Sequence, residues 1–486
     1  MNRKMVIKTT GMLLLAEACL LLLPLSVALW YRERCFYPLL LTAGLSAALG
    51  GGAMLWGRNA SKTIYSREGF VITALSWILL SAVGALPFYL SGEIPSYVDA
   101  FFETVSGFTT TGASILRDVE AMSRGLLFWR SFTHWVGGMG VLVFLMAMTN
   151  NLSDRSIHIM RAEMPGPIVD KLTPRTKDTA KVLYTMYFAL TFAEVALLLC
   201  GGMPLFEALV HAFGTAGTGG FGIYADSIAS YSPYLQWVIG VFMLVFGVNF
   251  NLYYLLLIRR FRSVLKSGEL YTYLGIAVGA TALVAFNIRH LYPAASEGIR
   301  TAFFQVSSIM TTTGFATADF DRWPTFSKTV LLLLMFIGAC AGSTAGGIKV
   351  SRVVIYLKNI HRELRRLLRP RAVNVIRLEG KTVDESVVRG QNAYLAVYAL
   401  SFCMICFLLA FDRFDLETNI SAAAACFNNI GPGFAAVGPT RSYADYSVFS
   451  KLVLSAAMLM GRLEIFPLLL TFSPTTWRTK HGTTRK

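Results

Sequence analysis

Ten separate stretches of mostly apolar residues, each about as long as a membrane-spanning helix, limit what this chain can fold into. They lie near residues 11–30, 36–56, 69–90, 125–148, 180–201, 233–258, 271–289, 326–345, 391–411 and 447–471. Only 15% of the 486 residues are charged, whereas soluble domains carry roughly 25%. The pattern therefore predicts ten membrane-spanning helices and disfavours a soluble multidomain, secreted or disordered protein.

The first stretch follows Asn2, Arg3 and Lys4, an arrangement that also occurs in cleaved signal peptides. It has no clear cleavage site made of small residues, and a second apolar stretch follows almost at once. These two observations favour an uncleaved membrane anchor.

The charged residues between the stretches are sorted by sign. Lys and Arg concentrate in both tails and in segments 57–68, 149–179, 259–270 and 349–390. The intervening loops are mostly acidic, and only the short loop Arg32–Arg34 departs from the pattern. Because loops rich in Lys and Arg stay in the cytoplasm, we expect both termini to be cytoplasmic. The net charge of +16 then reflects a basic cytoplasmic face and indicates no nucleic-acid partner.

A short motif that ends in glycine recurs four times in the loops predicted to lie outside. The first and third copies begin with Ala-Phe-Phe and end with Thr-Thr-Thr-Gly, the second ends with Thr-Gly-Gly, and the divergent fourth contains Asn-Ile-Gly-Pro-Gly. The reference glycines are Gly112, Gly220, Gly314 and Gly431, with Gly433 as the alternative in the fourth copy.

The apolar segment before each glycine, of about 10–13 residues, is too short to cross a bilayer and suits a re-entrant half-helix. Irregular backbone at membrane depth is tolerated only where protein buries it or water lines it. Four such turns around one axis would direct carbonyl oxygens inward, where they replace the hydration shell of a cation. Glycine permits a positive φ and leaves the axis free of side chains. Four ordinary hairpins with packing glycines are the alternative, which the fourfold recurrence disfavours.

The four turns resemble the filter loops of the Trk/Ktr/HKT potassium transporters. The resemblance covers essentially the whole chain and includes the segments Gly338–Lys349 and Gly461–Glu464. The two extra N-terminal stretches resemble the TrkH branch rather than the shorter KtrB branch. The resemblance implies an all-α membrane protein with ten transmembrane helices. Four pseudo-symmetric helix–pore loop–helix repeats would surround a central pore, after two N-terminal helices.

The resemblance implies that potassium binds in a filter made by three residues of each turn. These residues are Thr110, Thr111, Gly112, Thr218, Gly219, Gly220, Thr312, Thr313, Gly314, Asn429, Ile430 and Gly431. A glycine at all four reference positions favours potassium, because some sodium-permeable relatives have serine in the first turn. No cofactor bound by the chain is implied.

The resemblance also implies an intramembrane gate. The candidate gating residues are Gly338, Gly342, Ser343, Thr344, Gly346, Gly347, Lys349 and Arg462. Interior glycines destabilise a helix, so we expect a break within this stretch, with close helix packing as the alternative. Lys349 either anchors the loop or reaches toward the cytoplasmic surface. Arg462 either forms a barrier in the pore or pairs locally, although Glu464, two residues away, does not share its helix face.

Further expectations concern partners and location. The resemblance implies a homodimer in the bacterial inner membrane, controlled by a cytoplasmic ring of TrkA-like nucleotide-binding subunits. Potassium is the expected substrate, and rubidium is expected to permeate as well. The basic run from Lys358 to Arg371 can contact anionic lipids, this regulatory partner or both.

The expected organisation has six parts. They are two N-terminal helices (1–68), repeat 1 (69–150), repeat 2 (151–262), repeat 3 with the gating loop (263–358), a basic linker (359–390), and repeat 4 with the tail (391–486).

Two other classes of function were weighed against a pore. A secondary symporter coupled to protons or sodium usually has inverted repeats and broken helices at the midplane, whereas these four repeats are parallel. A membrane enzyme is disfavoured, because the sequence lacks HExxH, Walker A and GxSxG motifs, and the pore segments lack paired catalytic carboxylates.

Overall fold

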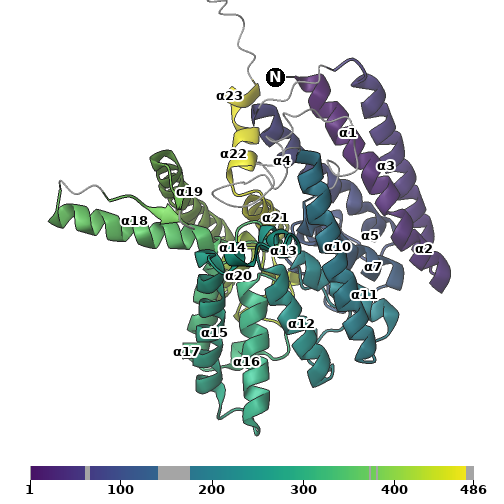
Figure 1. Cartoon of the computed structure of the whole chain (residues 1–486). Helices are drawn as coiled ribbons and strands as arrows, with labels where there is room; N and C mark the ends of the chain where they lie inside the picture. The colour runs from purple at the N-terminus through teal and green to yellow at the C-terminus, as the bar shows by residue number, and fades with distance from the viewer. Residues whose placement is uncertain (1, 61–65, 141–175, 371–373, 379–380, 478–486) are drawn as a thin grey trace, which may run out of the picture.

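The structure, a computed structural model, describes residues 2–60, 66–140, 176–370, 374–378 and 381–477. Most of these residues are helical (Figure 1). The end of the expected span 125–148, most of the basic segment 149–179 and the last residues of the C-terminal tail lie outside the described residues.

Helices account for all the regular structure described in the first half of the chain. They are α1 (Arg3–Leu20), α2 (Leu22–Tyr31), α3 (Phe36–Trp56), α4 (Ser66–Gly84), α5 (Leu86–Leu90), α6 (Tyr97–Phe108), α7 (Arg124–Gly138), α10 (Thr176–Cys200), α11 (Leu205–Gly217), α12 (Pro233–Phe246), α13 (Phe250–Leu257) and α14 (Phe261–Val264). Ser96 and Ser232 cap the N-termini of α6 and α12, because each side chain accepts a hydrogen bond from a backbone N–H of the first turn.

The second half is also mostly helical. Its helices are α15 (Gly268–Ile288), α16 (Ala295–Met310), η2 (Phe320–Arg322), α17 (Thr325–Phe336), α18 (Val350–Leu368), α19 (Glu385–Leu409), α20 (Leu416–Phe427), η3 (Ala435–Val437), η4 (Tyr443–Asp445), α21 (Val448–Arg462), α22 (Phe466–Phe472) and α23 (Pro474–Trp477). One small hairpin, β1 (Arg377–Leu378) and β2 (Lys381–Thr382), pairs antiparallel between α18 and α19.

Six helical segments among the described residues are long and apolar enough to cross a membrane. They are Arg3–Tyr31, Phe36–Trp56, Arg67–Leu90, Asp178–Cys200, Gly268–Ile288 and Glu385–Leu409. The pair α12 and α13 makes a seventh if it is counted as one span, although its halves are bent by 90°. The chain is therefore a helical membrane protein by length and composition.

The other expected spans are interrupted where the described residues cover them. An unbroken helix over 233–258 does not form, because α12 ends at Phe246 and Gly247 turns the chain. Likewise, α17 ends at Phe336 and the glycine-rich segment that follows is not helical. In the last stretch, Glu464 and Ile465 separate α21 from α22 and have φ of 52° and 68°.

Four short helices each lie between two longer ones that they contact. α6 contacts α4 and α7, α11 contacts α10 and α12, α16 contacts α15 and α17, and α20 contacts α19 and α21. The last helix of each unit also packs on the short helix of another unit, in the pairs α7–α11, α12–α16, α17–α20 and α21–α6. These contacts form a closed ring of four units. α1 and α2 pack against α4 and α7 at the edge of the first unit (Figure 1).

Candidate functional site

The chain makes the same turn at the end of each of the four short helices. These are turn 1 (Thr110–Gly112), turn 2 (Thr218–Gly220), turn 3 (Thr312–Gly314) and turn 4 (Asn429–Gly431). In each turn the second residue donates its N–H to the carbonyl oxygen five residues earlier, at 2.8 Å. The first residue has φ of 55–57° and the closing glycine has φ of 74–97°. Three Thr and one Asn therefore hold a left-handed conformation that costs free energy, which the surrounding contacts must offset.

The closing glycines lie against the backbone of the neighbouring turn. A Cβ added to Gly112 would lie 2.0 Å from the carbonyl oxygen of Gly219, and one on Gly220 would lie 2.0 Å from that of Thr313. The same construction places Gly314 2.0 Å from the carbonyl oxygen of Ile430. On Gly431 it would lie 2.6 Å from the carbonyl oxygen of Thr111, in turn 1. The four turns thus form a closed ring that has no room for a side chain at any of the four glycines.

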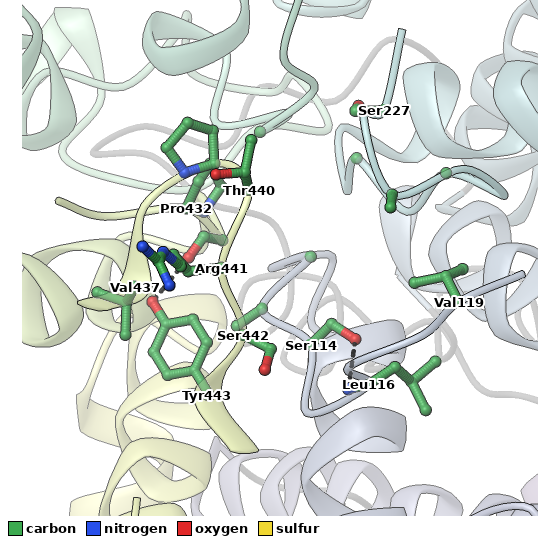
Figure 2. A pocket seen from close by; sticks show the side chains of 18 of the residues that line it. Ser114, Leu116, Val119, Ser227, Pro432, Val437, Thr440, Arg441, Ser442 and Tyr443 are labelled. Atoms are coloured by element: carbon green, nitrogen blue, oxygen red, sulfur yellow. Dashed lines mark hydrogen bonds between the residues drawn. The ribbon is translucent and has the colours of Figure 1, made fainter. Parts of the chain in front are cut away.

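A cavity of about 490 Å³ opens on one side of the ring. All four closing glycines line it, together with the loops that follow turns 1, 2 and 4. Figure 2 shows Ser114, Leu116 and Val119 from the first unit and the run from Thr440 to Tyr443 from the last, brought to the same cavity. The cavity therefore gives one common approach to all four turns.

The fourth turn closes at Gly431 rather than at Gly433. Gly431 lines the cavity with a φ of 97°, whereas Gly433 has no positive φ and its N–H is bonded to the Val437 carbonyl oxygen at 2.7 Å. The hydroxyl of Tyr443 donates to the carbonyl oxygen of Gly431 at 2.7 Å. Burial raises the pKa of Tyr443 well above its ordinary value, so this donor keeps its proton throughout the physiological range.

Polar side chains hold the turns in place from behind. In turns 1 and 3 the two threonine hydroxyls that flank the left-handed residue are 2.8 Å apart, in the pairs Thr109–Thr111 and Thr311–Thr313. Asn429 Nδ2 donates both to Thr111 Oγ1 at 3.0 Å and to the Met458 carbonyl oxygen at 2.9 Å. Turn 4 is therefore tied directly to turn 1 and to α21.

A buried ion pair braces turns 1 and 2. Arg130 Nε lies 2.6 Å from Glu103 Oε1, and the two side chains are 3% and 0% exposed. Glu103 also accepts hydrogen bonds from Ser114 Oγ and the Ile115 N–H, both at 2.9 Å, just after turn 1. Arg130 donates to the Gly222 carbonyl oxygen at 3.0 Å, just after turn 2.

His134, one helical turn after Arg130, occupies the space behind turn 2. Its Nδ1 lies 2.7 Å from the Gly107 carbonyl oxygen, at the end of α6. A Cβ added to Gly219 would lie 2.3 Å from the imidazole ring. Arg130 and His134 therefore reach from α7 to two turns at once.

The glycine-rich loop (Gly338–Lys349) is held in the gap between α12 and α13. The Gly338 N–H donates to the Ile348 carbonyl oxygen at 2.8 Å, which closes the base of the loop. The Cys340 N–H donates to the Gly247 carbonyl oxygen at 3.0 Å, at the bend between the two helices. Broken backbone in one segment therefore satisfies broken backbone in the other, as an apolar environment requires.

The tip of this loop touches turns 3 and 4. The Gly346 N–H donates to Thr312 Oγ1 at 2.7 Å. A Cβ added to Gly346 would lie 2.5 Å from the Asn428 carbonyl oxygen, next to turn 4. The Lys349 side chain is 1% exposed and donates to the carbonyl oxygens of Ala345 and Gly346. Lys349 thus binds the loop to itself and does not extend toward a membrane surface.

Arg462 connects the loop to the first unit. Its guanidinium donates to the Thr344 carbonyl oxygen at 2.7 Å and to those of Gly137 and Gly138 at 2.5 and 2.6 Å. Glu464 pairs instead with Arg352, in α18. The remaining loop candidates, Gly342, Ser343 and Gly347, lie in the same segment, and Gly342 and Gly347 have φ of 69° and 67°.

Comparison with known proteins identifies the family. The family model for TrkH, described as a cation transport protein, matches residues 41–479. The chain belongs to the TrkH family. It is therefore a transport protein and not an enzyme. Among the described residues, no group of three or more His, Cys, Asp or Glu side chains is placed to hold a metal ion.

TrkH relatives match almost the whole chain. A Trk system potassium uptake protein TrkH from Salmonella typhimurium is 37% identical over 98% of this chain and 100% of its own length. The Trk system potassium uptake protein TrkG of Escherichia coli is 35% identical over 96% and 97%. The crystal structure of the potassium transporter TrkH from Vibrio parahaemolyticus superposes with a TM-score of 0.89 at 34% identity, covering 98% of this chain and 100% of that one.

Several residues of this TrkH-family site escape sequence reasoning. Glu103, Tyr443 and Glu269 contact the turns or the loop; Glu269 accepts the Ala341 N–H at 2.8 Å. The acidic character of Glu103, inside an apolar pore segment, is the signal that could have identified it, because a buried carboxylate requires a partner. Tyr443 lies in an outer loop with no distinguishing pattern, so no signal in the sequence indicates it.

The buried ion pair predicts a large loss of stability in Arg130→Gln, because Glu103 would remain buried without its charged partner. We expect the free energy of unfolding to fall by about 3–5 kcal/mol. The matched control is Arg117→Gln, whose ion pair with Asp445 has side chains 74% and 67% exposed and should contribute at most about 1 kcal/mol. Denaturant unfolding of the purified protein measures both, and equal losses would contradict a special role for the buried pair.

Proposed function

We propose that the chain takes up potassium across the bacterial inner membrane, through a pore whose narrowest part is the ring of four turns. The carrying observation is that the four closing glycines meet backbone carbonyl regions of the neighbouring turns and all line one cavity. Backbone carbonyls suit a weakly held, dehydrated monovalent cation, because each is a neutral oxygen ligand and exchange stays fast. The printed names of the relatives, which are potassium uptake proteins, agree with this assignment.

In this proposal the filter residues are the twelve residues of turns 1 to 4, within four pseudo-symmetric repeats. The closed ring of contacts among the four units supports that arrangement. The expected division into an N-terminal pair of helices, repeats 1 to 4 and a basic linker remains part of the proposal. So do the ten transmembrane helices, of which the interrupted ones would cross as broken spans.

The gate of the proposed pore is the glycine-rich loop with Arg462. The loop lies against turns 3 and 4, and Arg462 binds it to the end of α7. A guanidinium at this position opposes a cation electrostatically, and it also holds the loop closed by three hydrogen bonds. Opening would require these bonds to break, which is a step that a regulatory partner can control.

The proposal includes the partners that the sequence indicates. They are a second copy of the chain, a cytoplasmic TrkA-like nucleotide-binding ring, and membrane lipid, with both termini cytoplasmic. A secondary symporter coupled to protons or sodium remains the competing function. It differs in one measurable respect, since its flux requires a second ion gradient.

Rubidium uptake into liposomes that contain the purified protein tests the pore. We expect uptake driven by the potassium or rubidium gradient alone, without a proton or sodium gradient. Gly314→Ala should reduce it about tenfold or more, equivalent to about 1.4 kcal/mol, because the new Cβ meets the Ile430 carbonyl. Gly92→Ala is the control: Gly92 has φ of 78°, but a Cβ there meets nothing within 4 Å. An equal loss in both variants, or an absolute need for a second ion gradient, would argue against the proposal.

A second measurement concerns the gate. Arg462→Gln removes the positive charge and weakens the bonds to Thr344, Gly137 and Gly138, so basal rubidium flux should increase severalfold. Removal of the loop tip around Gly346 should increase it in the same direction. Flux that is unchanged in both variants would exclude a gating role for this loop.

The third measurement is selectivity. Each turn contributes one left-handed residue and one closing glycine, which suggests a short filter with few ion sites. We therefore expect a permeability ratio of potassium over sodium below about a hundredfold in bi-ionic flux assays. A larger ratio would require a longer series of sites than this ring provides.

A further inference from the structure

Helix α18 lies at the level where two apolar spans begin. At its N-terminus, the Ser351 N–H donates to Glu269 at 3.0 Å, and Glu269 is the second residue of the span Gly268–Ile288. Farther along, Arg362 pairs with Glu385 at 2.7 Å, and Glu385 is the first residue of the span Glu385–Leu409. Figure 1 shows α18 projecting sideways from the bundle, across the direction of α15 and α16. The helix therefore runs along a membrane surface and not through the membrane.

The two sides of α18 differ in chemistry. An apolar stripe recurs every three or four residues and is exposed, with side chains at Leu357, Ile360, Leu364, Leu367 and Leu368. Leu367 and Leu368 are 80% and 84% exposed. Basic residues occupy the adjacent face. A helix with an exposed apolar stripe beside a basic face is the pattern of helices that lie in the plane of a membrane surface.

A cavity of about 440 Å³ lies on the basic face, between α18 and the segment that leads into β1. The charged residues that line it are basic: Lys358, Arg362, Arg365 and Arg377, with His361 beside them. Lys358 donates to the Arg377 carbonyl oxygen at 2.8 Å, which holds one wall in place. No carboxylate lines the cavity among the described residues, so its charge is complementary to an anion.

Leu357, Val375 and Ile376 also line this cavity, and Leu357 belongs to the apolar stripe. The cavity and the stripe are therefore continuous. This continuity selects among anions, because a soluble phosphate would leave the stripe exposed to water, whereas a phospholipid would cover both regions.

We propose that α18 and β1 form a binding site for an anionic phospholipid of the leaflet on the basic side. The headgroup phosphate occupies the cavity between Lys358, Arg365 and Arg377, and the acyl chains lie along the stripe. The site lies next to Arg352, which pairs with Glu464 two residues after Arg462. Lipid occupancy would thus hold α18 against the membrane surface beside the break between α21 and α22.

Binding of fluorescent phosphatidylglycerol to the purified, delipidated full-length protein tests this site without any flux measurement. Arg365→Gln and Arg377→Gln should each weaken binding about fivefold, since one basic residue near an anionic surface contributes roughly that factor. Phosphatidylcholine should bind more weakly and should not respond to these changes. Arg366→Gln is the matched control, because Arg366 is on the same helix but does not line the cavity.

Three results would overturn the proposal. The first is unchanged phosphatidylglycerol affinity in the Arg365→Gln, Arg377→Gln double variant. The second is complete displacement by millimolar inorganic phosphate, which would assign the cavity to a soluble anion. The third is efficient disulfide cross-linking between two copies of an Ile360→Cys variant in lipid, which would show that a second copy covers the stripe. Because the assay reads binding, its failure would leave the proposed pore untouched, and failure of the pore would leave this site untouched.

Discussion

The structure depends on one constraint: backbone N–H and C=O groups that leave a helix inside the membrane must find partners within the protein. The chain breaks its helices at the four turns, at Gly247, over the glycine-rich loop and at Glu464. Each break is satisfied by another. The loop donates to the bend after α12, and the Arg462 guanidinium binds carbonyl oxygens at the end of α7 and in the loop. Irregular backbone therefore accumulates around one axis and not at the lipid-facing surface.

Buried charge serves the same purpose. Glu103 and Arg130 form a pair whose desolvation is tolerable only because both ends also bind backbone groups of turns 1 and 2. Glu269 accepts two backbone N–H groups, one from the loop and one from the start of α18. In each case a charged side chain replaces the water that an exposed turn would use. These side chains fix the geometry of the turns, and the turns supply neutral oxygens toward the cavity.

Much of this arrangement was predictable, because its signals are local. Apolar length predicts the continuous helices α3, α10, α15 and α19 closely, and the recurring glycines predict the four turns to the residue. The bend of 90° between α12 and α13 was not predictable. The stretch 233–258 is apolar throughout, and what ends α12 at Phe246 is the loop more than 90 residues later, which binds the freed carbonyl of Gly247.

The sequence by itself determined which residues must adopt unusual backbone: positive φ favours glycine, and a fourfold motif of Thr, Asn and Gly indicates where a helix must end. Only the tertiary structure decided which partners those residues meet. Arg462 reaches Gly137 across 325 positions, and Asn429 reaches Thr111 across 318. The fourth closing glycine is Gly431 because its neighbour is turn 1, which no local pattern can specify. Spacing along the chain reports conformation, whereas a ring closes only through contacts between segments that are remote in sequence.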